Sequence, residues 1–282
     1  AAPANAPAAP GAAPAPTDDP IGAEKALVCV RAGEGFYFVH GDPMASLACF
    51  LDAVNLGETS GVAGLVANGW GIVGTALRAA GLTRAGRYYL DRGLREVRAV
   101  HDERQLAYAQ YHLGACAVMA GDWDEAERAL DESATHGHRA GGFLVNNTWS
   151  VAAIAALLAG RLSRAADVAA LLDGLDPMQR TPRGQLVAVS TRAMVTLLRG
   201  DAAEALALAR PAKAAFKAMN DLGWILPCAV VARASLVLDA RDEARAEAQE
   251  LLDALRGTRS PDPRRLEGYA GAGTITMAGY DY

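Results

Sequence analysis

Six residues of the sequence have the spacing of a dinucleotide-binding loop, in which a glycine backbone approaches a pyrophosphate at the start of a helix. Gly69, Gly71 and Gly74 supply the G-x-G-x-x-G pattern, and the acidic Glu96 follows about twenty residues later, where such folds bind a ribose hydroxyl. This chemistry requires a strand before the loop and a further strand–helix unit after it. No such unit follows Gly74, so we expect these glycines to be packing positions within a helix.

Other residues capable of catalysis or metal binding are scattered. His136 and His138 form a pair that could ligate a metal, but no further ligand is close in sequence, and we place them in a link between helices. The four cysteines include no C-x-x-C pair and lie in apolar helical contexts, which favours buried thiols; a disulfide between Cys29 and Cys49 is the alternative. The sequence contains no G-x-S-x-G motif. We therefore predict no catalytic residue, no metal, no cofactor and no enzymatic activity.

Charge and hydropathy narrow the class of partner. The net charge is −5 and no long run has one sign, which argues against a nucleic-acid partner. No stretch reaches about 18 uninterrupted apolar residues, so we expect no membrane partner and a cytoplasmic protein. Alanine is abundant and aromatic residues are few, which favours an all-α fold.

The elements that position any functional side chain follow a fixed period. A glycine or, once, an aspartate recurs every 39 or 40 residues, and a small residue follows each of them five positions later. The markers are Gly41, Gly81, Gly121, Gly160, Gly200 and Asp239. This period predicts six helix-turn-helix units, each stabilised by stacking on its neighbours. Their expected ranges are 22–57, 60–100, 102–141, 142–177, 182–221 and 222–256.

Residues 107–134 carry the clearest unit, with a turn at Gly121-Asp122 between two helices. Its packing positions, at helical spacing, are Leu113, Gly114, Ala126, Leu130 and Ala134. The pattern resembles a tetratricopeptide (TPR) repeat. Its longer period resembles the TPR-like arms of bacterial signal-transduction ATPases, MalT-like regulators and helical regions attached to some cyclases. The resemblance covers residues 22–256 and implies an α-solenoid of about six TPR-like repeats of about 40 residues.

Two segments flank the expected helical repeat domain, which spans residues 21–257. Residues 1–20 are rich in alanine and proline and are expected to form a disordered linker. Residues 258–282 include many glycines and three tyrosines and show no helical period. We expect this C-terminal tail to be extended or disordered.

In TPR-like arrays the first helices of the units line a concave groove. The resemblance therefore implies a protein- or peptide-binding scaffold or sensor module of a bacterial signalling or regulatory protein. The candidate contact residues are polar or aromatic side chains on the first helices that the core pattern does not use. They are Arg31, Tyr37, Asn68, Trp70, Tyr108, Tyr111, Asn146, Trp149, Arg192 and Trp224. Two alternatives stay open: a self-associating regulatory module with its own C-terminal tail in the groove, and an enzyme with its site among the first helices.

Overall fold

The structure is a computed structural model and describes residues 19–36, 43–142, 144–219 and 221–258. Over these residues the chain is all-α, with twelve α-helices, two short 3₁₀ helices and no strand. The α-helices are α1 (Pro20–Gly35), α2 (Pro43–Thr59), α3 (Ala67–Ala79), α4 (Thr83–Val100), α5 (Glu103–Ala120), α6 (Trp123–Arg139), α7 (Val145–Leu158), α8 (Leu162–Gly174), α9 (Pro182–Leu198), α10 (Ala202–Ala218), α11 (Ile225–Val237) and α12 (Arg241–Thr258). None of these helices is both long enough and apolar enough to cross a bilayer.

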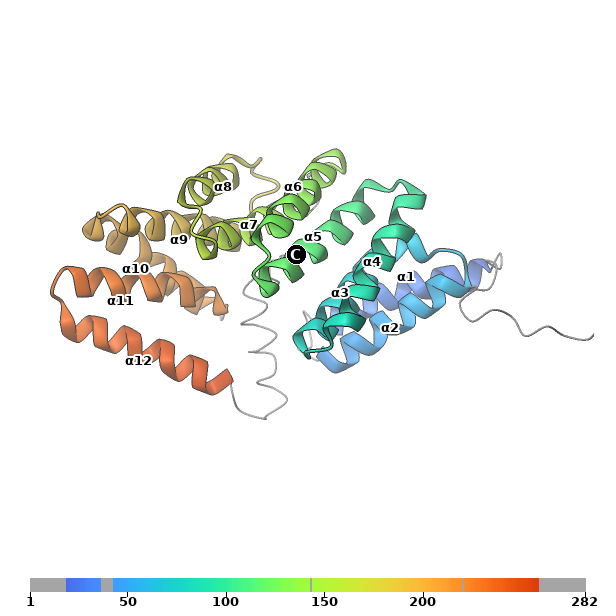
Figure 1. Cartoon of the computed structure of the whole chain (residues 1–282), viewed down its shortest axis with the longest axis horizontal. Helices are drawn as coiled ribbons and strands as arrows, with labels where there is room; N and C mark the ends of the chain where they lie inside the picture. The colour runs from blue at the N-terminus through green and yellow to red at the C-terminus, as the bar shows by residue number, and fades with distance from the viewer. Residues whose placement is uncertain (1–18, 37–42, 143, 220, 259–282) are drawn as a thin grey trace, which may run out of the picture.

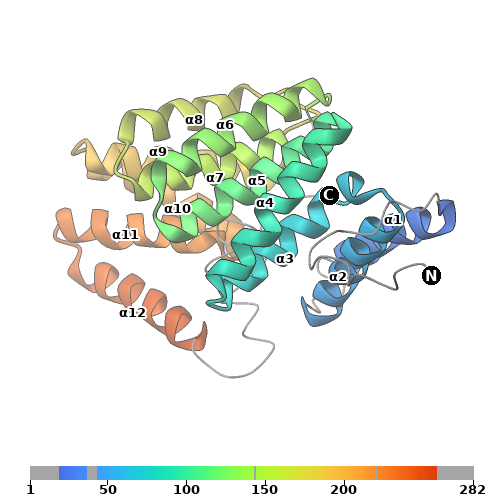
Figure 2. The ribbon, with the colours of Figure 1, turned by 45° about the vertical axis from the view of Figure 1, so that its right-hand side comes forward.

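Consecutive helices form six antiparallel pairs, in which the odd-numbered helix is the first helix and the even-numbered one is the second. The second helix of each of the first five pairs contacts the first helix of the next pair, and α3, α5, α7, α9 and α11 also contact one another in that order. The pairs follow one another from α1–α2 at the right of Figure 1 to α11–α12 at the lower left. The turned view in Figure 2 shows the same order.

The turns within the pairs occupy the predicted marker positions. Each described marker has a left-handed backbone, with φ values of 81° at Gly81, 73° at Gly121, 71° at Gly160, 101° at Gly200 and 60° at Asp239. Glycine adopts this conformation without the steric cost that a Cβ brings, and aspartate is among the more tolerant other residues. The predicted turns are thus confirmed at these five markers, and Gly41 lies outside the described residues.

Aspartates after the turns start the second helices. Asp122 accepts a hydrogen bond from the backbone N–H of Glu125 at 3.3 Å, and Asp201 accepts one from the N–H of Glu204 at 3.0 Å. Each satisfies a backbone donor that has no partner within its own helix. These aspartates are therefore the N-caps of α6 and α10.

Small residues allow the two helices of a pair to approach closely. A Cβ on Gly114 would lie 2.7 Å from Cγ of Leu130, and a Cβ on Gly74 would lie 2.7 Å from Cγ of Leu90. Both leucines are buried, at 0% exposure for Leu130 and 5% for Leu90. A leucine of the second helix therefore fills the space that the glycine of the first helix leaves open.

The apolar core extends along the row of pairs. One cluster of buried residues joins α5 to α10, another joins α1, α2 and α3, and a third joins α9, α10 and α11. Each pair thus completes its core with side chains of its neighbours, because one pair alone has too little apolar surface to bury.

Three sequence expectations are not confirmed by the described residues. His136 and His138 lie in the last turn of α6, not in a link, so that placement was wrong. A basic side chain is favoured there by the helix dipole, and His136 Nδ1 lies 2.6 Å from a carboxylate oxygen of Glu103. All four cysteines are free thiols, so the alternative disulfide does not form. The predicted linker before Asp19 and the predicted tail after Thr258 lie outside the described residues.

Candidate binding surface

Buried polar side chains gather on the first helices. Helices α5 and α7 are buried along most of their length, so they present polar groups to neighbouring helices and not to water. Buried polar groups are nearly always hydrogen-bonded. Some of these side chains bond to a neighbouring element, as Asn68 and Asn146 do, whereas Ser150 and Ser190 bond to carbonyl oxygens of their own helices. Those on first helices are Glu34, Asn68, Thr75, Gln110, His112, Asn146, Asn147, Thr148, Ser150, Arg183, Ser190, Thr191 and Ser235.

A chain of hydrogen bonds joins the first helices of the first three pairs. The amide nitrogen of Asn68 on α3 donates to a carboxylate oxygen of Glu34 on α1 at 2.9 Å. The amide oxygen of Asn68 then faces Nε2 of His112 on α5, also at 2.9 Å. Because an ionised carboxylate only accepts, Glu34 fixes the orientation of the Asn68 amide, and His112 must donate from Nε2. Asn68, predicted as a surface contact, instead links three helices inside the molecule.

The histidine of this chain explains one glycine of the G-x-G-x-x-G pattern. His112 is fully buried, and a Cβ on Gly71 would lie 2.0 Å from its Cδ2 atom. Burial lowers the pKa of His112 to about 3, so the ring is neutral at physiological pH. Gly69, Gly71 and Gly74 all lie within helix α3, which is a packing role and not a nucleotide loop. The sequence-based preference for packing glycines is confirmed.

Four further candidates from the sequence are also buried. Trp70 is 2% exposed and donates from its indole nitrogen to the carbonyl oxygen of Ala63 at 3.0 Å. Tyr111 and Trp149 belong to the largest core cluster. Asn146 is 8% exposed and donates to the hydroxyl of Thr181, 2.6 Å away, at the start of α9. These side chains hold neighbouring pairs together.

The other candidates lie nearer the surface. Tyr108 is half-buried and stacks on His112, and Trp224 is half-buried beneath the ammonium group of Lys217, 5.1 Å from the ring centroid. Arg31 and Arg192 are exposed or half-exposed, and each forms an ion pair, with Glu34 and Asp173 respectively. Tyr37 lies outside the described residues.

Large apolar side chains are exposed at one repeated position that the sequence reasoning missed. Two residues before the turn marker, Leu158 is 61% exposed, Leu198 is 40% exposed and Val237 is 63% exposed. Their helices, α7, α9 and α11, run parallel, and each contacts the next. Equivalent positions on packed parallel helices lie about 8–10 Å apart, so the three side chains line one edge of the row. We call Leu158, Leu198 and Val237 the apolar edge.

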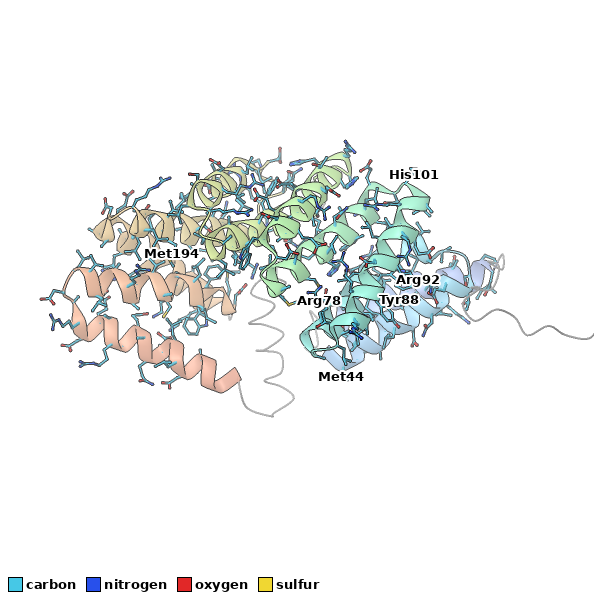
Figure 3. The ribbon with its side chains drawn as sticks, in the orientation of Figure 1. Met44, Arg78, Tyr88, Arg92, His101 and Met194 are labelled. Atoms are coloured by element: carbon cyan, nitrogen blue, oxygen red, sulfur yellow. The ribbon has the colours of Figure 1, made fainter. Side chains whose placement is uncertain are left out.

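Charged residues of the second helices are engaged across pairs. Arg92 on α4 pairs with Glu58 on α2 at 2.9 Å, and its guanidinium covers the Trp70 ring at 5.6 Å and donates to the hydroxyl of Tyr88. Figure 3 shows Arg92 and Tyr88 on the same helix. Other ion pairs between consecutive second helices are Arg87–Glu125, Arg164–Glu127 and Arg210–Glu243, at 3.0, 3.1 and 2.7 Å. The second-helix face is therefore a solvated, charge-paired surface.

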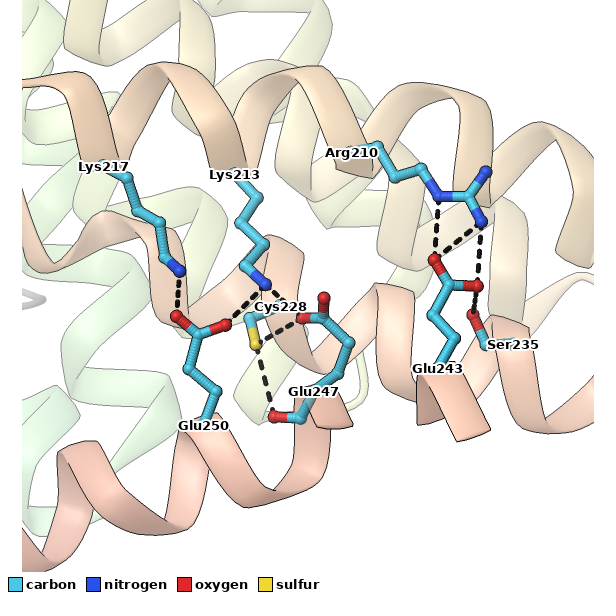
Figure 4. A network of polar contacts seen from close by, with 8 residues as sticks. All are labelled: Arg210, Lys213, Lys217, Cys228, Ser235, Glu243, Glu247 and Glu250. Carbon is cyan, nitrogen blue, oxygen red and sulfur yellow. Dashed lines mark hydrogen bonds and ion pairs between the residues drawn. The ribbon is translucent and has the colours of Figure 1, made fainter. Parts of the chain in front are cut away.

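A denser polar cluster joins α10, α11 and α12 (Figure 4). The ammonium group of Lys213 contacts the carboxylates of Glu247 and Glu250, and the thiol of Cys228 donates to Glu247 at 2.9 Å. Cys228, Glu247 and Glu250 lie close enough to share a metal ion. However, burial and the bond to Glu247 raise the pKa of the Cys228 thiol to about 12, and Lys213 already supplies the positive charge. The cluster is best explained as an ion-pair network between helices.

Comparison with known proteins assigns no function, so a functional proposal must be based on the geometry described above. No protein-family model matches the sequence, and no curated protein is significantly similar to it. The apolar edge is one surface feature that the fold of the described residues does not itself use.

Proposed function

We propose that the chain is a TPR-like α-solenoid that binds a protein or peptide segment along its first helices. The support is the repeated geometry: six helix pairs, left-handed turn residues at the predicted markers, and contacts between successive first helices. This arrangement resembles the TPR-like arms of bacterial signalling regulators, for which partner binding is the usual role. The binding of a partner requires a surface that the array itself leaves open.

The single observation that carries the proposal is the apolar edge. Single exposed apolar side chains at scattered positions are normal on the surface of a monomeric protein and do not indicate a binding site. Three of the exposed apolar side chains, Leu158, Leu198 and Val237, recur at one register position in three successive units, so these three form a line. Such a line fits an extended or helical segment that places an apolar side chain at each unit.

Peptide selection tests the proposal directly. The immobilised protein is screened against a library of random twelve-residue peptides, and enriched peptides are measured against the protein and against a Leu158→Glu, Leu198→Glu, Val237→Glu variant. We expect enriched peptides rich in apolar residues, and at least tenfold weaker binding to the triple variant. The reason is that each glutamate places a charge where the ligand must exclude water.

Met178 supplies the matched control. It is 92% exposed and apolar but lies between α8 and α9, away from the apolar edge. Met178→Glu should leave peptide binding unchanged. Absence of any enriched peptide, or equal binding by the protein and the triple variant, would show that the apolar edge does not bind a segment.

A further inference from the structure

The last described pair, α11–α12, carries an open trough. Its volume is about 510 Å³, and its apolar lining comes from Ala229, Ala232 and Leu236 of α11 and Ala244, Ala248 and Leu251 of α12. Leu236 is 61% exposed. Six of the nine lining residues are small or apolar, as in a helix–helix contact, and the other three are arginines.

In the earlier pairs the matching positions are covered. Nine residues after the turn marker, the residues Phe50, Leu90, Leu130, Ala169 and Ala209 are at most 5% exposed, whereas Ala248 is exposed. Each earlier pair has the first helix of the next pair against it. Helix α12 is the last described helix and contacts α11 and α10, so among the described residues no first helix of a following pair lies against it. The missing cover is therefore equivalent to one further first helix.

The sequence supplies a segment of the required type. Residues 268–278, GYAGAGTITMA, align without a gap with residues 69–79 of α3, GWGIVGTALRA. Glycine, glycine, threonine and alanine are identical at the first, sixth, seventh and last positions, and an aromatic residue stands second in both. This segment lies outside the described residues.

Helix α3 shows why glycine in this pattern is compatible with a first helix. Gly74 makes room for Leu90 of its own pair, and Gly71 makes room for His112 of the following pair. Gly69 faces the preceding pair, where its added Cβ would lie 3.8 Å from Cβ of Ala53 on α2. The glycines weaken the isolated helix but permit the close approach that stabilises it in the array.

The link between α12 and this segment would have the same length as two links that the structure describes. Seven residues link α2 to α3, and seven link α8 to α9. A helix over residues 266–278 would have the thirteen residues of α3 and would also follow a link of seven residues after α12.

We propose that residues 266–278 form a seventh first helix that occupies the α11–α12 trough of the same chain. In this arrangement Gly268 takes the place of Gly69 and lies against Leu251, which occupies the position of Ala53. The segment carries Glu267 and no basic residue, and the lining of the trough includes Arg233, Arg241 and Arg245. Arg241 and Arg245 also pair with Asp239 and Asp242, so the net charge available to Glu267 is that of Arg233. This inference concerns a different surface from the apolar edge and does not depend on the proposed function.

A designed disulfide tests the position of the segment. Cβ atoms about 3.8 Å apart suit a disulfide, so Leu251→Cys with Gly268→Cys should cross-link under mild oxidation. The pair Ala53→Cys with Gly69→Cys sets the expected yield, because the structure places those Cβ positions 3.8 Å apart. Mass spectrometry of the linked peptide separates this bond from any bond to the native cysteines. We expect an intramolecular bond in the monomer.

Leu252 provides the matched control, because it is adjacent to Leu251 and 46% exposed. Leu252→Cys with Gly268→Cys should cross-link at least tenfold more slowly. Equal rates for the two pairs, no cross-link, or cross-links only between two chains would overturn the proposal.

Hydrogen exchange gives a second measurement that does not use cysteine. A chain ending at residue 265 should show at least tenfold faster amide exchange in α11 and α12 than the full chain, with α5 and α6 unchanged. A peptide of residues 263–282 added to the shortened chain should restore the slow exchange. Identical exchange in the full and shortened chains would overturn the proposal.

Discussion

At the scale of single residues, three glycines of α3 have different tasks although they share one sequence pattern. Gly71 makes room for a buried ring, Gly74 makes room for a leucine, and Gly69 has ordinary van der Waals contacts at 3.4 Å. Sequence spacing alone assigns the same structural role to all three glycines. Their neighbours in space, which come from three different helices, decide how each responds to substitution.

Replacing Gly71 and Gly69 separately should therefore give opposite results. A Cβ on Gly71 would overlap His112, so Gly71→Ala should lower the free energy of unfolding by about 1–3 kcal/mol. Gly69→Ala has space for its Cβ and gains helix propensity, so it should leave stability unchanged or raise it by up to about 1 kcal/mol. Urea denaturation of both variants measures the difference. A destabilised Gly69→Ala beside an unaffected Gly71→Ala would contradict the packing described for α3.

The buried His112 should make stability depend on pH. Its pKa falls from the ordinary value of 6.5 to about 3 on folding, so between these values the unfolded chain binds more protons. Stability from this group is complete above pH 6.5 and falls by about 1.4 kcal/mol per pH unit as the pH drops through that window. Urea denaturation at pH 5 and pH 6 measures the slope, ahead of most carboxylate titration.

His112→Gln is the informative variant, because its amide can still donate to Asn68 but does not titrate. We expect the slope between pH 5 and pH 6 to decrease by about 1.4 kcal/mol per pH unit. The exposed His138 serves as the control, and His138→Gln should keep the original slope. A slope that survives in His112→Gln would mean that other groups cause the pH dependence.

At the scale of helices and turns, the marker residue affects the stability of each helix pair, because it must adopt the left-handed turn conformation. Asp239 has a φ of 60° and forms an ion pair with Arg241, and both side chains are largely exposed. An exposed ion pair of this kind contributes at most about 1 kcal/mol, and the left-handed backbone favours glycine.

Asp239→Gly should therefore stabilise the protein by about 0.5–1 kcal/mol, because glycine adopts the turn conformation without steric cost. Gly121→Ala, at the same position of the third pair, should destabilise it by about 1–2 kcal/mol. Thermal denaturation of the two variants measures both changes. Destabilisation by Asp239→Gly would show that the aspartate side chain matters more than the backbone conformation.

At the scale of the whole molecule, the period of the sequence predicted the helix pairs because turns and helix crossings have strict local requirements. A left-handed turn selects glycine, and a close helix crossing selects a small residue, so both leave a trace at fixed spacing. Five described markers and the crossing glycines Gly74 and Gly114 confirm that part.

The candidate surface was harder to predict for a physical reason. Trp70, Tyr111 and Asn68 are large or polar in ways that also suit ligand contacts, but side chains of other helices bury them. The residues of the apolar edge also recur at the fixed spacing, two residues before the marker. In the sequence, however, an apolar residue at a helix end cannot be distinguished from a core residue, because its exposure is not known.

The ion pairs of the second helices have a mechanical consequence. Most of them connect one second helix to the next, although Asp173 of α8 pairs with Arg192 of α9, whereas neutral hydrogen bonds such as Asn68–His112 connect the first helices. Raising the ionic strength from 0.15 to 1 M shortens the screening length from about 8 to about 3 Å, so it weakens the connections of one layer selectively. If the layer of second helices loosens while the layer of first helices does not, the row of helix pairs changes its curvature towards the first helices. Small-angle X-ray scattering should therefore show a curvature that changes steadily with salt and is insensitive to sucrose, so that the ionic strength of the medium sets the bend of the array.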